Sequence, residues 1–357
     1  MIKSLQIQVS PETSTKIHLL KINVSNLLKI DKKSITHIEI KKKSVDARQK
    51  IIKINLTIEV YINEEFVTPN NIDFNFKSVK NSNHVNIIGA GPAGLFAALT
   101  LIENGIKPIL YERGKNVKNR RRDLANITKE HIVNVDSNYC FGEGGAGTYS
   151  DGKLYTRSKK RGDVNRILDI LVNHGANPDI KINAHPHIGT NKLPKIIENI
   201  RNTILECGGE IHFNTRVVDI KVKEKKINKL ELKNGDIIDC KKLILATGHS
   251  ARDIFEILDR NNILIESKSF ALGVRVEHSQ KLIDQIQYKC NERGDYLPPA
   301  PYSIARQVNG RGVYSFCMCP GGIIAPCATN PGEVVTNGWS PSKRNGPHSN
   351  SGIVVEL

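Results

Sequence analysis

The sequence has few aromatic residues and no long hydrophobic run. Phenylalanine, tyrosine and tryptophan together make up 5% of the 357 residues. No apolar run approaches the ~20 residues that a membrane-spanning helix needs. Residues 1–5 also lack the continuous apolar segment of a signal peptide. We therefore expect a cytoplasmic protein without a membrane partner.

The seven cysteines lack the regular spacing of a disulfide framework. A chain of this length can bury hydrophobic cores large enough to fold without disulfides or metals. Cys317 and Cys319 are two positions apart in a predicted strand and would point to the same face, but a disulfide between them would be strained. His185 and His187 have the spacing of two metal ligands, yet no further ligands follow nearby. We predict no metal site.

Acidic residues are too few to balance the basic ones, and the formal net charge is +16. Residues 41–43, 120–122 and 159–161 are clusters of lysine and arginine, which would suit a nucleic-acid partner. However, the basic residues are not interleaved with aromatic side chains that could stack on bases. Lysine is also used heavily along the whole chain. The sequence therefore disfavours a nucleic-acid partner.

The most informative stretch runs from residue 85 to residue 113. An apolar run at residues 85–88 leads into Gly-Ala-Gly-Pro-Ala-Gly at residues 89–94, and good helix formers follow. Asn104 and Gly105 end the predicted helix, and a second apolar run at residues 109–111 precedes an acid. This order of strand, glycine turn, helix, strand and acid is typical of a dinucleotide-binding βαβ unit.

Each glycine of this pattern, and the acid that follows it, has a physical task. Gly89 permits the tight turn, Gly91 lets the backbone approach a pyrophosphate, and Gly94 allows close packing of helix and strand. The free N–H groups at the helix start would face the anion. Glu112 can accept hydrogen bonds from the hydroxyls of an adenosine ribose. A purely structural glycine turn is the alternative, and the complete context of the motif argues against it.

A glycine-dense loop follows at residues 141–152. Five glycines in twelve residues add little to a core and are costly to order, so we expect a ligand to fix the loop. Its successive N–H groups could surround phosphates, and Thr148 and Asp151 offer polar contacts. A flexible surface loop is the alternative interpretation.

The chain is predicted to be an α/β protein of three parts. Residues 1–80 form a small α+β domain, residues 81–260 a dinucleotide-binding domain and residues 261–357 a mixed α/β substrate domain. Periodicity predicts helices at 17–28, 163–174 and 193–207, strands at 5–9, 35–40 and 52–62, a β-meander at 211–222, 227–232 and 237–240, and a buried strand at 243–248. The residues from 69 to 83 are predicted to be a linker.

Several motifs resemble those of one family. The segments 141–154, 186–190, 246–253, 274–278 and 314–322 look like the signatures of a bacterial family of uncharacterised FAD-dependent dehydrogenases, within the two-dinucleotide-binding flavoprotein superfamily. The N-terminal unit with Ser-Val-Asp-Ala-Arg at residues 44–48 also fits this family. The resemblance implies a Rossmann-like FAD/NAD(P)-binding domain with a β-meander. Family members continue beyond the equivalent of Leu357, which implies that the third domain is cut short here.

The resemblance also implies FAD as the cofactor and NADH or NADPH as a transient electron donor. The residues expected to hold FAD are Gly89, Gly91, Pro92, Ala93 and Gly94 at the pyrophosphate, Glu112 and Arg113 at the ribose, Gly144, Gly145, Ala146, Gly147, Thr148 and Asp151 near phosphate and flavin, Val218 at the adenine, and Thr247 and Gly248 closing the pocket. The catalytic candidates are His187, Arg275 and Cys317, and Arg275 could stabilise the reduced flavin or an anionic substrate.

These features predict a FAD-dependent oxidoreductase in which the flavin accepts hydride or electrons from a small-molecule substrate or an electron carrier. Two alternatives from other functional classes stay open. One is a flavin- or nucleotide-binding scaffold or fragment without turnover, suggested by the expected truncation. The other is a flavoprotein acting on RNA, suggested by the positive charge.

Overall fold

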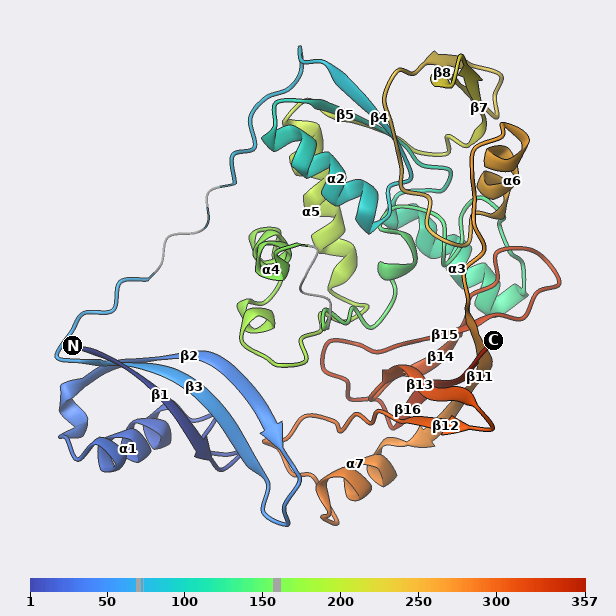
Figure 1. Ribbon diagram of the computed structural model, residues 1–357. Coiled ribbons are helices and arrows are strands. Elements are labelled where there is room, and N and C mark those ends of the chain that lie inside the picture. The colour runs from blue at the N-terminus through green and yellow to red at the C-terminus, as the bar shows by residue number, and fades with distance from the viewer. Residues whose placement is uncertain (69–71, 73, 157–161) are drawn as a thin grey trace.

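The computed structural model describes residues 1–68, 72, 74–156 and 162–357 (Figure 1). The start of the predicted linker and the basic cluster at residues 159–161 lie outside these described residues. The buried hydrophobic side chains gather in three cores, one of which is shared by the two ends of the chain.

The N-terminal unit is a three-stranded antiparallel sheet with one helix packed on it. Its strands β1 (Ile2–Val9), β2 (Ile35–Asp46) and β3 (Lys53–Ile62) are arranged in the order β1-β3-β2. Alternate residues of β3 are buried, and helix α1 (Ile17–Leu28), followed by the short helix η1 (Lys32–Ser34), adds Leu20 and Val24 to that core. The predicted helix is confirmed, and β2 extends to Asp46 before the hairpin turn into β3.

The second unit is built on a parallel sheet, which confirms the Rossmann-like α/β fold. Strands β4 (His84–Ile88), β5 (Lys107–Tyr111), β6 (Glu210–His212) and β10 (Leu243–Leu245) are arranged in the order β10-β4-β5-β6. Helices α2 (Pro92–Glu103) and α5 (Leu193–Glu206) pack on the face that carries Ile87 and Leu110. Helices α4 (Val164–Asn173) and η3 (Pro178–Lys181) extend the same core.

The other face of the parallel sheet is covered by a β-meander. Strands β7 (Val217–Lys223), β8 (Lys226–Leu232) and β9 (Ile237–Asp239) form it, and helix α6 (Arg252–Arg260) packs beside them. Ile88 and Tyr111, the last residues of β4 and β5, contribute to this core. Since side chains alternate along a strand, the same strands supply both cores.

Two predictions about secondary structure are corrected here. The strand predicted at residues 211–222 is two strands, β6 in the parallel sheet and β7 in the meander, because Asn214 with a φ of 54° turns the chain between them. The helix α3 (Val117–Glu130), which contains the basic cluster at residues 120–122, was not predicted. Within the described part of the chain, no helix is long and apolar enough to cross a bilayer.

The C-terminal part is an antiparallel sheet with one helix. Strands β11 (Ala271–Ser279), β12 (Ala305–Val308), β13 (Arg311–Cys319) and β16 (His348–Glu356) are arranged in the order β11-β16-β13-β12, beside the hairpin of β14 (Ile323–Pro326) and β15 (Thr336–Trp339). Helix α7 (Gln280–Tyr288) and Met318 pack against the core of the N-terminal unit. The first and last parts of the chain therefore lie together, as Figure 1 shows.

The described part of the predicted linker is anchored to the second unit. Phe74 and Val79 are buried in the core formed by α2 and α5, and the N–H of Val79 donates to the carbonyl oxygen of Cys207 at 2.7 Å. These residues lie in no helix or strand, which is why periodicity did not reveal their burial.

The burial of Val79 leads to a stability prediction. Val79→Ala should lower the free energy of unfolding in urea by about 2 kcal/mol, because it leaves a cavity in a packed core. Val67→Ala is the matched control, since Val67 is 78% exposed and should change stability by less than about 0.5 kcal/mol. Equal effects of the two changes would contradict the packing of this segment.

Candidate dinucleotide-binding site

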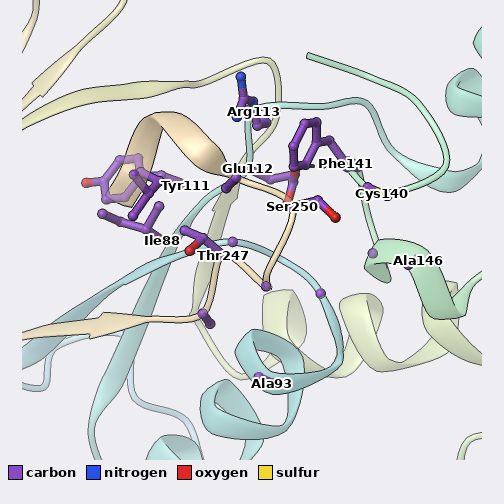
Figure 2. Close-up of a pocket in the computed structure, with 18 of the residues that line it drawn as sticks. Ile88, Ala93, Tyr111, Glu112, Arg113, Cys140, Phe141, Ala146, Thr247 and Ser250 are labelled. Carbon is purple, nitrogen blue, oxygen red and sulfur yellow. Dashed lines mark hydrogen bonds between the residues drawn. The ribbon is translucent and has the colours of Figure 1, made fainter. Parts of the chain in front are cut away.

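A cavity of about 260 Å³ lies where β4 and β5 end and α2 begins. Figure 2 shows Glu112, Arg113 and Phe141 at one end of this cavity and Ala93 of α2 at the other. The lining also includes Gly89, Gly91, Pro92, Gly142, Gly145, Ala146, Gly147, Thr215, Arg216, Val217, Thr247 and Gly248. The cavity thus joins the βαβ turn, the glycine-rich loop, the meander and the segment after β10.

The three glycines of the turn differ in what surrounds them. A Cβ on Gly89, whose φ is 102°, would lie 2.5 Å from the carbonyl oxygen of Ala246, and a Cβ on Gly94 would overlap the carbonyl oxygen of Gly89. A Cβ on Gly91 would meet nothing closer than the Cα of Gly145 at 3.9 Å. The fold therefore requires glycine at 89 and 94, whereas the space beside Gly91 belongs to the cavity.

The start of α2 presents unused hydrogen-bond donors to this space. Gly91 is the N-cap and makes no side-chain capping bond, and Pro92 at the first helical position has no N–H. The described residues provide no acceptor for the N–H groups of Ala93 and Gly94. These donors and the positive end of the helix dipole together favour an anion at this position.

The Glu112 carboxylate is buried and accepts hydrogen bonds from three backbone N–H groups. Its Oε2 accepts from Ala90 at 2.8 Å, and its Oε1 accepts from Gly114 at 2.8 Å and from Gly142 at 3.0 Å. A carboxylate can accept about four hydrogen bonds. Glu112 thus ties the glycine-rich loop to the βαβ turn and keeps capacity for a ligand hydroxyl.

A network of charged side chains closes the end of the cavity near Glu112. Arg113 and Arg216 each bind both Asp136 and Asp253, at distances from 2.9 to 3.3 Å, and Lys233 also binds Asp136. Burial acts to raise the pKa of Asp136, but the hydrogen bonds from Lys233 and Arg113 leave it lowered. The Arg113 guanidinium also lies 4.3 Å from the centre of the Phe141 ring. Ion pairs therefore fix the side chains that close this end of the cavity.

The glycine-rich loop is ordered by Arg120, a member of the basic cluster at residues 120–122. Arg120 is fully buried and donates to the carbonyl oxygens of Asn138, Tyr139 and Glu143 at 2.7 to 2.8 Å. A Cβ on Gly142 would lie 2.5 Å from the Arg120 Cδ atom. The protein itself therefore holds the loop, where we expected a ligand to do so, and the buried Arg120 side chain is not available to an external partner.

The glycine-rich loop contains the short helix η2 (Gly145–Gly147), and further buried groups stabilise it. Glu143 accepts from the N–H of Val117 and from Arg201, at 2.7 and 2.9 Å, and burial raises its pKa. The Thr148 hydroxyl donates to the carbonyl oxygen of Glu143 at 2.8 Å. Asp151, which is 1% exposed, forms ion pairs with Lys153 and Arg344. Thr148 and Asp151 therefore support the loop rather than line the cavity.

A second cavity of about 400 Å³ adjoins the first. The two share Cys140, Ala146, His249 and Ser250, and the second also reaches β11, β16 and the hairpin of β14 and β15. Arg275 lines it, with Nη1 donating to the Asn350 Oδ1 at 2.6 Å and to the carbonyl oxygen of Cys317 at 3.2 Å. The two cavities are therefore neighbours, and the second is bounded by the C-terminal sheet.

Several of the other predicted residues do not line the first cavity. Val217, rather than the predicted Val218, lines the first cavity. His187 lines a different cavity and bonds through Nε2 to the carbonyl oxygen of Ser342 at 3.0 Å, and burial lowers its pKa. Cys317 lines neither dinucleotide cavity. Among the described residues, no three His, Cys, Asp or Glu side chains are grouped to hold a metal.

Sequence reasoning missed the residues that act through long-range contacts. Arg120, Glu143, Arg216 and Asp253 all come from segments that are far apart in the chain. The sequence offered one signal for these contacts, the acid Glu143 inside the glycine-rich loop. A buried carboxylate needs a positively charged or hydrogen-bonding partner. Periodicity carries no information about which distant arginine that partner is.

Comparisons with known proteins agree with this geometry. Residues 83–285 match the family model described as pyridine nucleotide-disulphide oxidoreductase, and residues 269–357 match FAD-dependent protein, C-terminal domain-like. Residues 1–61 match a domain of unknown function. A protein of Clostridium beijerinckii described as uncharacterized is 39% identical over 96% of this chain and 67% of its own length.

The similar solved structures are more distant in sequence. A flavoprotein/dehydrogenase from Cytophaga hutchinsonii matches with 13% identity and a TM-score of 0.38, over 76% of this chain and 55% of that chain. The THI4 protein of Thermovibrio ammonificans matches with 17% identity and a TM-score of 0.35, over 52% of this chain and 64% of that one. This chain therefore spans between half and two thirds of the length of these structures.

The buried position of Arg120 leads to the prediction for this site. Arg120→Met should lower the free energy of unfolding by about 3 kcal/mol or more, because three buried carbonyl oxygens lose their donors. Arg122→Met is the matched control, since Arg122 is exposed on the same helix. Chemical denaturation measures both variants. If Arg120→Met lowers the free energy of unfolding no more than Arg122→Met does, the loop does not depend on the Arg120 guanidinium.

Proposed function

Because the chain belongs to the family of pyridine nucleotide-disulphide oxidoreductases, we propose that it is a FAD-dependent oxidoreductase. The observation that carries the proposal is the open space beside Gly91, which faces unused N–H groups of α2 and lies in a cavity that shares lining residues with the second one. A dinucleotide has an anionic centre between two flat ends, and this space offers donors in the middle and room at both ends.

Residues from four segments would hold the cofactor. Gly91, Ala93 and the 145–147 turn would contact the pyrophosphate, and Glu112 would accept a hydrogen bond from a ribose hydroxyl. The stretch 215–217 would lie against the adenine, in the end of the cavity closed by the Arg113 network. The second cavity, with Arg275 in its lining, has the position required for a flavin ring and a substrate.

When bound, FAD supplies a two-electron acceptor, and the chain supplies position and charge. We propose that Arg275 holds an anionic group of the substrate, because its Nη1 is fixed by Asn350 while the described residues provide no acceptor for its Nη2. The substrate would be a small molecule or an electron carrier, and NADH or NADPH the electron donor. The cytoplasm is the compartment we propose, where its free cysteines would stay reduced.

The direct test is an absorbance spectrum of the purified chain, followed by anaerobic titration with NADH and NADPH. We expect a flavin spectrum, either as purified or after addition of FAD, that bleaches with one of the two nucleotides. A chain that stays colourless and fails to retain FAD in equilibrium dialysis would overturn the cofactor assignment. Retained FAD that neither nucleotide bleaches would leave the cofactor in place and reject the proposed donor.

The glycine geometry gives a sharper test of the cofactor position. Gly91→Ala should weaken FAD binding about tenfold or more while leaving the melting temperature of the unliganded chain unchanged, because a Cβ at this position enters the cavity and meets no packed atom. The φ of Gly91, −71°, suits alanine equally well.

Gly94→Ala is the matched comparison. Its Cβ would overlap the carbonyl oxygen of Gly89, so we expect a loss of folding stability of about 1–3 kcal/mol even without cofactor. Fluorescence titration with FAD and thermal unfolding without it separate the two effects. Unchanged FAD affinity in the Gly91 variant would show that the cofactor lies elsewhere.

A further inference from the structure

A cluster outside the dinucleotide cavities brings two thiols and a lysine together. The regular pairing of β13 with β16 is broken between Phe316 and Cys319, and Cys317 has a φ of 50° at this bulge. Positive φ is rare for residues other than glycine, asparagine and aspartate, and it often marks a functional site. The bulge removes the extended geometry that would separate residues 317 and 319 by about 6.6 Å.

The thiol of Cys319 lies directly against Cys317. Its thiol donates to the carbonyl oxygen of Cys317 at 3.3 Å. Cys319 is buried, whereas Cys317 is only half-buried and can be reached by a small molecule. One thiol is therefore accessible and the other is held behind it.

Lys153 supplies a positive charge to both sulfur atoms. Its Nζ lies 3.2 Å from the Cys319 Sγ and 3.8 Å from the Cys317 Sγ. The buried Asp151 holds the lysine through an ion pair of 2.9 Å and is itself paired with Arg344. Arg275 also reaches the carbonyl oxygen of Cys317. The thiols thus lie in a positively charged setting, which favours a thiolate.

The ionisation of the two thiols differs accordingly. The hydrogen bond from Cys319 lowers the pKa of Cys317, and the charges of Lys153 and Arg275 act in the same direction against the effect of burial. The same hydrogen bond and burial raise the pKa of Cys319. These directions favour the thiolate on Cys317 and the protonated thiol on Cys319.

We propose that Cys317 and Cys319 are a peroxide-sensitive dithiol, in which Cys317 reacts with hydrogen peroxide and Cys319 closes a disulfide, with Lys153 holding the reactive thiolate. The proposal is independent of FAD and goes beyond the function proposed above. It concerns a modification site in the C-terminal sheet, bounded by the loop that carries Asp151 and Lys153.

The chemistry balances in two steps. The Cys317 thiolate attacks one oxygen of hydrogen peroxide, so that a sulfur–oxygen bond forms, the oxygen–oxygen bond breaks, and the departing hydroxide takes a proton to become water. The Cys319 thiol then attacks the sulfenic acid, so that the disulfide forms, the sulfur–oxygen bond breaks, and the Cys319 proton leaves in a second water. Two thiols lose two electrons, and one peroxide is reduced to two waters.

The test is titration of the purified chain with hydrogen peroxide, followed by alkylation and mass spectrometry of the peptide that contains residues 317 and 319. We expect this pair to lose two hydrogens and resist alkylation, and dithiothreitol to reverse both changes. Cys207 is an internal control that should stay reduced, because burial raises its pKa. Oxidation of Cys207 at the same rate as the pair would overturn the proposal.

Three variants test the separate roles. Lys153→Met should slow the oxidation about tenfold, whereas Lys153→Arg keeps the charge and should retain most of the rate. Cys319→Ser should stop at a sulfenic acid on Cys317 that dimedone traps. Lys221→Met, at an exposed lysine elsewhere on the surface, is the control for removal of a charge. Equal rates for Lys153→Met and the parent chain, or no trapped sulfenic acid in Cys319→Ser, would reject the proposal.

Discussion

The site depends on one buried carboxylate. Glu112 accepts hydrogen bonds from Ala90 in the βαβ turn, from Gly114 after β5 and from Gly142 in the glycine-rich loop. Hydrogen bonds to an ionised acceptor in a buried setting are about twice as strong as neutral ones. Three segments that would otherwise be independent are therefore held at fixed positions, and the cavity between them has a defined shape before any ligand enters.

The glycine-rich loop is also held by a buried charge, which here is a positive guanidinium that donates hydrogen bonds to backbone carbonyl oxygens. Arg120 donates to three carbonyl oxygens, and Arg201 pairs with Glu143. A glycine-rich segment loses much conformational entropy on folding, so that ordering it needs several strong bonds. Part of the large positive charge of the chain is thus used inside the molecule, which weakens the link between net charge and an external anionic partner.

The sequence predicted those parts of the fold that are determined locally. The alternation in β3, the helix at 17–28 and the strand, turn and helix around Gly91 follow from residues close together in the chain. The division of residues 210–223 into β6 and β7, the burial of Val79 and the role of Arg120 depend on distant partners. The bulge at Cys317 belongs to the second group, because β16 defines the pairing that it interrupts.

The three glycines of the motif differ in whether packing requires them, and the sequence alone does not show this difference. Gly89 and Gly94 are each required by a neighbouring carbonyl oxygen, so the fold alone would keep them. No packed atom requires glycine at position 91, and its backbone conformation suits any residue. As the N-cap of α2, glycine is less stabilising than Ser, Asp or Asn by about a few tenths of a kcal/mol. The proposed cofactor, whose pyrophosphate would approach the backbone at Gly91, would account for a residue without a side chain at this position.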